Sequence, residues 1–154
     1  MIKRKSKGIS VLEVIIGISL VLILIRVAII PLVDYRASVS VRTQAESIAS
    51  TLVDAKNKTL SSVGATQYGV HFTTDDYTLF AGASYNSNNS QNVTLTLDSA
   101  TITDISLQGG GADVVFARLL GTVSSYGTIT ITSTKDSSQE KIITITKSGA
   151  VSVN

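Results

Sequence analysis

Hydrophobic positions change their spacing along the chain. Over residues 9–33 nearly every side chain is apolar, and only Glu13 and Arg26 carry a formal charge. A run of this kind favours a helix that is apolar on all sides. At ~1.5 Å per residue the run would span ~37 Å as a helix, which exceeds a bilayer core of ~30 Å. We therefore expect residues 9–33 to form the transmembrane and assembly half of an amino-terminal helix.

The apolar positions that follow recur at helical spacing. They are separated by steps of four and three residues, which places them on one stripe of a helix. Charged residues occupy the other faces. The pattern predicts that residues 34–60 continue the helix as an amphipathic half lying against a sheet. The stripe consists of Val41, Ala45, Ile48, Leu52 and Ala55.

Pro31 falls between these two stretches. Proline lacks a backbone N–H and its ring clashes with the preceding turn, so it predicts a kink. A helix that simply stops at a membrane surface is the alternative. The stripe beyond Pro31 favours continuation to about Leu60.

After residue 60 the pattern becomes alternation of apolar and polar residues in short segments. Alternation bounded by turn-forming residues is typical of β-strands. We expect residues 61–154 to form an exported antiparallel β-sheet domain packed on the helix, which makes the fold class α+β. Strands are expected at 68–72, 77–80, 93–97, 101–107, 113–119, 128–132, 141–146 and 150–153.

Composition narrows the function classes. The 154 residues suit one modest domain with an appendage, and 44% hydrophobic against 16% charged residues excludes a disordered chain. Cysteine is absent, which excludes disulfides, thiolate metal sites and lipidation on Cys. The net charge of +2 depends on four basic residues within the first eight positions. The rest of the chain is slightly acidic and is not a polyanion binder by bulk charge.

The basic segment before the apolar run has three interpretations. The positive-inside rule keeps it cytoplasmic and places the residues after the run outside. A secretory signal peptide has a shorter apolar region and a small-residue cleavage site, which are missing here. A plain anchor leaves Glu13 unexplained, because a carboxylate at the centre of a spanning helix costs ~2.5–3.5 kcal/mol.

The third interpretation uses every feature of this segment. A basic leader ending in Gly8, then Ile9 and an apolar run with Glu13 as its fifth residue, resembles the class III signal of type IV pilins and pseudopilins. The resemblance implies that residues 1–8 are a leader, cut by a prepilin peptidase between Gly8 and Ile9. It also implies N-methylation of Ile9 and a proline near Pro31. Ile9 departs from the usual Phe.

The order of motifs after the helix is similar to that of the H-type minor pseudopilin of type II secretion and its FimT-type relatives. The resemblance implies a structural subunit of a pseudopilus or type IV pilus with a pilin fold. It implies as partners the prepilin peptidase, other subunits, a membrane platform, an assembly ATPase and membrane lipid. The expected location is the inner membrane as a single-pass protein, with the amino terminus cytoplasmic and the carboxy-terminal domain extracytoplasmic. The motifs are YGV-F, YTLF, GTVSSYGTITI, KIITI and SGAVSV.

Glu13 then has a physical purpose. Cleavage creates an α-ammonium group at Ile9, and burying that charge in a filament is costly unless it is paired. We hypothesise that Glu13 of one subunit pairs with the Ile9 amine of a neighbour and sets the axial register of assembly.

The sequence gives no sign of an active site, so we expect no enzyme, cofactor or metal site. His71 is the single histidine, in an alternating segment, and a surface or cross-strand role is favoured over a general base. The pair Asp75 and Asp76 lacks the ligand spacing of a calcium loop and is predicted to be a solvated turn.

Two other functions are weighed against the structural one. A DNA-capturing minor pilin needs cations converging on phosphates. The β-domain has four basic residues against seven acidic ones, so nucleic acid is not expected, although a patch of Lys135, Lys141 and Lys147 stays open. A membrane-anchored β-domain without a filament role predicts an uncut amino terminus.

Overall fold

The computed structural model describes residues 8–154, apart from the side chains of residues 27–34. The chain forms two compact units, Met1–Arg36 and Ala37–Asn154. The basic leader up to residue 7 and the predicted kink at Pro31 lie outside the described residues and side chains, so both stay predictions.

Helix α1 runs over Val11–Leu60, and a 3₁₀ turn, η1 (Val63–Ala65), follows it. The expected fold class was wrong about a transmembrane first half. The described apolar stretch of that half, 11–26, has 16 residues. Over the part of the chain that the structure describes, no helix offers an apolar run sufficient to traverse a membrane.

The second stretch of α1 packs as its stripe predicted. Its apolar positions at helical spacing are all buried in the core of the Ala37–Asn154 unit. A helix with a single apolar stripe buries that stripe against a sheet and leaves its polar faces in solvent. The burial of the stripe confirms the prediction. The buried positions are Val41, Ala45, Ile48, Leu52 and Ala55.

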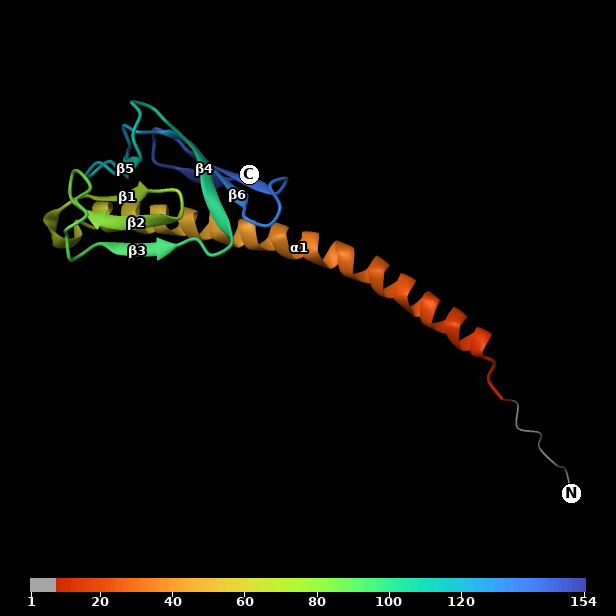
Figure 1. The fold of residues 1–154 in the computed structure, drawn as a ribbon. Helices are drawn as coiled ribbons and strands as arrows, with labels where there is room; N and C mark the ends of the chain where they lie inside the picture. Colours follow the sequence, from red (N-terminus) through yellow and green to blue (C-terminus); the bar gives the residue numbers. More distant parts are fainter. Residues whose placement is uncertain (1–7) are drawn as a thin grey trace, which may run out of the picture. The chain divides into compact units, whose positions relative to one another are not determined.

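The expected antiparallel β-sheet domain consists of two four-stranded sheets. All pairings are antiparallel, and β1, β2 and β3 lie beside the carboxy-terminal half of α1 in Figure 1. The first sheet has the order β3-β2-β1-β5, from β1 (Tyr68–Phe72), β2 (Asp76–Ala81), β3 (Val93–Thr96) and β5 (Asp113–Val115). The second has the order β4-β6-β7-β8, from β4 (Ala100–Leu107), β6 (Gly127–Ser133), β7 (Glu140–Ile145) and β8 (Val151–Val153).

The second sheet exists because β4 does not pair beside β3. It crosses to β6, with a bulge between Ile102 and Asp104. Both sheets then contribute alternate residues to one core with the α1 stripe, including Val70 from β1 and Ile129 and Ile131 from β6.

Each predicted strand position is occupied by a strand, with one shortened. The expected strand at 113–119 ends at Val115. Phe116 makes only an isolated bridge to Val123, and the chain turns between them. This turn returns to the edge of the unit beside α1.

Candidate assembly site

Residues 8–10, which precede helix α1, are exposed. Gly8 and Ile9 precede the first helical residue, and among the described residues no atom beyond the chain neighbours lies within 4 Å of the position that a Cβ on Gly8 would take. Ser10 caps the helix, because its Oγ accepts from the Leu12 N–H at 3.3 Å. The predicted cleavage bond therefore lies in accessible, non-helical backbone just before a capped helix.

Glu13 lies in the first turn of α1 and is exposed. It stands three residues after Ser10, the spacing of a capping box. The helix amino terminus carries a partial positive charge, which a carboxylate in this turn stabilises. Sequence analysis missed Ser10, although Ser-x-x-Glu before an apolar run is a recognisable start signal. The structure describes no ion pair at Glu13, so its predicted pairing with a neighbour's amine stays a prediction.

A large apolar surface follows from Ile9 to Ile25. We call it the apolar helix surface. Its side chains are 47% to 78% exposed, on all sides of the helix. Contiguous exposed apolar surface beyond a few hundred Å² marks an interaction site. Its members are Ile9, Val11, Leu12, Val14, Ile15, Ile16, Ile18, Leu20, Val21, Leu22, Ile23, Leu24 and Ile25.

The outward face of the second helical stretch is charged and paired within itself. Arg42 Nε lies 2.8 Å from Glu46 Oε1, and Lys58 Nζ lies 2.8 Å from Asp54 Oδ2. The hydrogen bond and charge of Glu46 raise the pKa of Arg42 above its ordinary value. Charged groups on this face are paired with each other, unlike the apolar helix surface.

His71 joins strands, as expected. Its Nδ1 lies 2.5 Å from Asp113 Oδ1 on the neighbouring strand β5. The ring stacks on Tyr85 at a centroid distance of 3.9 Å, and Tyr85 meets Phe80 edge-on. These contacts fasten the loop after β2 over the outer face of the first sheet, which is a structural role.

Asp76 lies at the turn between β1 and β2. Its Oδ1 accepts from Thr73 Oγ1 at 2.8 Å, which confirms the predicted turn at Asp75 and Asp76. Among residues 8–154 with described side chains, no three His, Cys, Asp or Glu residues group to hold a metal ion.

The three lysines of the DNA alternative do not converge. Lys141 is at the start of β7 and Lys147 lies just beyond its end, and a strand of this length separates them by ~20 Å. Asp136 and Glu140 lie in the same hairpin as Lys135. The arrangement therefore does not bring all three lysines to one place.

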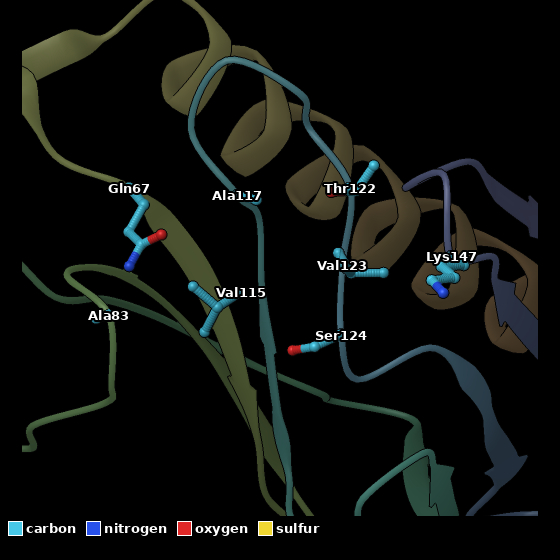
Figure 2. A pocket seen from close by; sticks show the side chains of 8 residues that line it. All are labelled: Gln67, Ala83, Val115, Ala117, Thr122, Val123, Ser124 and Lys147. Carbon is cyan, nitrogen blue, oxygen red and sulfur yellow. The ribbon is translucent and has the colours of Figure 1, made fainter.

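A hollow of about 460 Å³ lies at the seam of the two sheets. Figure 2 shows its lining on β5, on the returning segment and at the end of β7. Among the residues that line the hollow, Lys147 alone is titratable, so the lining contains no pair of residues that could act as general acid and general base. The lining residues are Gln67, Ala83, Val115, Ala117, Thr122, Val123, Ser124 and Lys147.

Comparison with known proteins gives no relative. No protein-family model, no curated protein and no solved structure matches the chain.

Proposed function

We propose that this chain is a pilin-like structural subunit, of the minor pseudopilin kind. In this proposal a prepilin peptidase removes residues 1–8, and the shortened chain joins a filament through its amino-terminal helix. The observation that carries the proposal is the apolar helix surface, exposed on every side behind an accessible Gly8–Ile9 bond. The other partners of this function are neighbouring subunits, a membrane platform and an assembly ATPase.

The start of helix α1 supports the hypothesis that pairing between Glu13 and the amine of Ile9 sets the axial register of neighbouring subunits. Cleavage places an ammonium group at Ile9, one residue before the Ser10 cap. That charge adds to the positive end of the helix dipole, so a carboxylate nearby becomes more valuable. Glu13 supplies it in the first turn. In an assembly where the surrounding surface is apolar, an unpaired amine would be excluded.

The first test is the mass of the native protein from the cell envelope. We expect a chain that begins at N-methylated Ile9. A chain that still begins at Met1 contradicts the proposal and favours a β-domain without a filament role.

The second test removes the charge of Glu13 and keeps its shape. We expect Glu13→Gln to lower entry into sheared filaments by about tenfold or more, because leaving the amine buried without its partner costs about 3–5 kcal/mol. Glu46→Gln is the matched control on the charged face and should assemble normally.

Mixed expression locates the pairing. If Glu13 pairs between subunits, a Glu13→Gln chain should enter filaments with wild-type chains better than alone, since its amine still finds a wild-type carboxylate. Normal assembly of Glu13→Gln by itself would show that Glu13 only caps the helix.

A further inference from the structure

The loop between β2 and β3 is rich in asparagine. We call residues 82–92 the asparagine loop, and Figure 1 shows it joining the end of β2 to the start of β3. Asparagine followed at the second position by serine or threonine is the acceptor sequence for N-linked glycans in exported proteins. The chain contains this sequence three times, and two of the three begin in this loop. They are Asn57–Thr59, Asn88–Ser90 and Asn92–Thr94.

The acceptor sequence needs two accessible groups. The side-chain nitrogen of the asparagine forms the bond to the sugar, and the hydroxyl two residues later is the group that the sequence requirement selects. A group that is buried, or held by another hydrogen bond in the folded unit, is closed to a transferase. Exposure and hydrogen bonding therefore rank the three sequences.

Asn57 lies in helix α1, and the threonine of its sequence is closed. Thr59 is 0% exposed. Its Oγ1 donates to the Ala55 carbonyl at 2.8 Å and accepts from the Tyr68 N–H at 2.9 Å. Because this hydroxyl is used within the core, Asn57 is not an acceptor in the folded chain.

Asn92 is closed at both groups. Its Nδ2 donates to the Asn86 carbonyl at 2.8 Å, and its Oδ1 is buried. Thr94 lies in β3, where its Oγ1 is 2.9 Å from Thr78 Oγ1 on β2. Modification of Asn92 would break the hydrogen bond that closes the asparagine loop.

Asn88 is open at both groups. Asn88 and Ser90 are exposed, and among the described residues neither side chain makes a hydrogen bond. The backbone is fixed instead, because the N–H groups of Asn88 and Asn89 donate to Oδ1 and the carbonyl of Asn86, at 3.0 and 3.1 Å. Tyr85, stacked on the histidine of β1, fastens the start of this turn to the sheet. The turn therefore presents Asn88 to solvent without any change in the fold.

We propose that Asn88 is an N-glycosylation site. The donor is a glycan whose anomeric carbon is joined to a diphosphate carried by a membrane lipid. Asn88 Nδ2 forms a bond to the anomeric carbon, and the bond from that carbon to the diphosphate oxygen breaks. The lipid diphosphate is the leaving group, and the amide nitrogen gives up one proton. The transfer changes no oxidation state.

The inference rests on one part of the proposed function, the export of Ala37–Asn154, because N-linked glycans of this kind are added to exported proteins. It adds to that function a modification away from the apolar helix surface. Asn88 lies in a turn outside both sheets. A glycan on its side chain therefore leaves the strand pairings and residues 9–25 as they are.

The first experiment is mass spectrometry of the native chain from the cell envelope. Chymotrypsin, which cuts after Tyr85 and Leu95, should release residues 86–95 as a fragment heavier than its sequence by one or more sugar residues. Fragmentation that keeps side-chain groups attached should place the added mass on Asn88. Added mass on Asn57, Asn92 or a serine of this loop would contradict the selection by the fold.

The second experiment tests the sequence requirement. Ser90→Ala keeps the asparagine and removes the hydroxyl, so we expect the glycan mass to be lost, as with Asn88→Gln. Ser90→Thr restores a hydroxyl and should restore the glycan. Thr94→Val is the matched control, because it removes the hydroxyl of the Asn92 sequence and should leave the glycan in place.

The outcomes separate this site from the proposed function. A chain that begins at Ile9 with Asn88 unmodified, or a glycan that survives Ser90→Ala, overturns the glycosylation site alone. A chain that begins at Met1 with a glycan on Asn88 overturns the filament subunit and supports the site. A chain that begins at Met1 with Asn88 unmodified overturns both.

Discussion

Two stretches of helix α1 share a conformation and differ in what they bury. Residues 11–26 are apolar on every side and exposed, whereas residues 37–60 bury one narrow stripe and keep a charged face. A stripe specifies one partner surface within the same chain. A helix apolar all round specifies no single side, so it needs partners around its whole circumference. The proposed filament would supply such partners.

The largest expected effect is on the free energy of unfolding, which a core substitution in residues 37–60 should lower far more than a substitution in residues 11–26. Leu52→Ala should lower the free energy of unfolding by ~2–5 kcal/mol, because it opens a cavity in the core. Ile16→Ala, on the apolar helix surface, should change the stability of the unassembled chain by less than ~0.5 kcal/mol. Urea unfolding of the full chain in mild detergent, followed by circular dichroism, measures both.

Equal losses would break the comparison. They would mean that the apolar helix surface is buried within its own chain in solution. Assembly should respond in the opposite order, with Ile16→Asp reducing filament recovery and leaving unfolding unchanged.

The burial of residues 37–60 could be predicted from the sequence, because it depends on the spacing of apolar residues that are near one another in the chain. Val41 to Ala55 recur at helical spacing, and alternation located every strand. The division of the strands into two sheets could not be predicted from the sequence. The apolar positions of β3 and β4 alternate in the same way, and only their pairing with strands distant in the sequence places them in different sheets. The membrane-spanning expectation was wrong, because no helix among the described residues is long and apolar enough to cross a membrane.

The candidate site divides in the same way. Gly8, Ile9 and Glu13 were singled out by their resemblance to the type IV pilin signal. The Ser10 cap could have been predicted from the Ser-x-x-Glu motif. The left-handed φ of Leu119, in the turn after β5, could not be predicted from the sequence. This turn depends on Gly121 and Gly149, which fit closely against α1 and against each other. Such contacts between distant segments leave no periodic signal. Tyr85 was missed for the same reason, since its stack on His71 joins a polar loop to a strand.

The next prediction compares hydroxyl groups in the two stretches. Thr59 is buried; its Oγ1 donates to the Ala55 carbonyl at 2.8 Å and accepts from the Tyr68 N–H at 2.9 Å. Thr59→Val leaves the Tyr68 N–H unpaired and should cost ~1–3 kcal/mol. Ser19 makes a similar bond to the Ile16 carbonyl but is exposed. Ser19→Ala should have no measurable effect on thermal unfolding, and a comparable loss at both positions would refute the contrast.

A smaller change should make the second stretch behave like the first. Arg42→Leu combined with Glu46→Leu replaces an exposed ion pair by an apolar patch. Exposed ion pairs contribute little to stability, so unfolding should scarcely move. Sedimentation velocity should instead show self-association of the full chain. Arg42→Gln with Glu46→Gln removes the charges without adding apolar surface, and association of that variant would assign the effect to charge alone.

The smallest effect concerns an exposed carboxylate far from both stretches. The Ser138 hydroxyl and then its backbone N–H donate to Asp136, which lowers the Asp136 pKa below its ordinary 3.8. A carboxylate whose folded pKa is lowered stabilises the fold above its unfolded pKa. That stabilisation disappears as the pH falls through the folded pKa. The urea midpoints of wild type and Asp136→Asn should therefore differ slightly at pH 6 and converge as the pH falls below the lowered pKa of Asp136. Ser138→Ala removes the first donor and should reduce the same difference, and midpoints that stay apart at low pH would assign the effect of Asp136→Asn to something other than its charge.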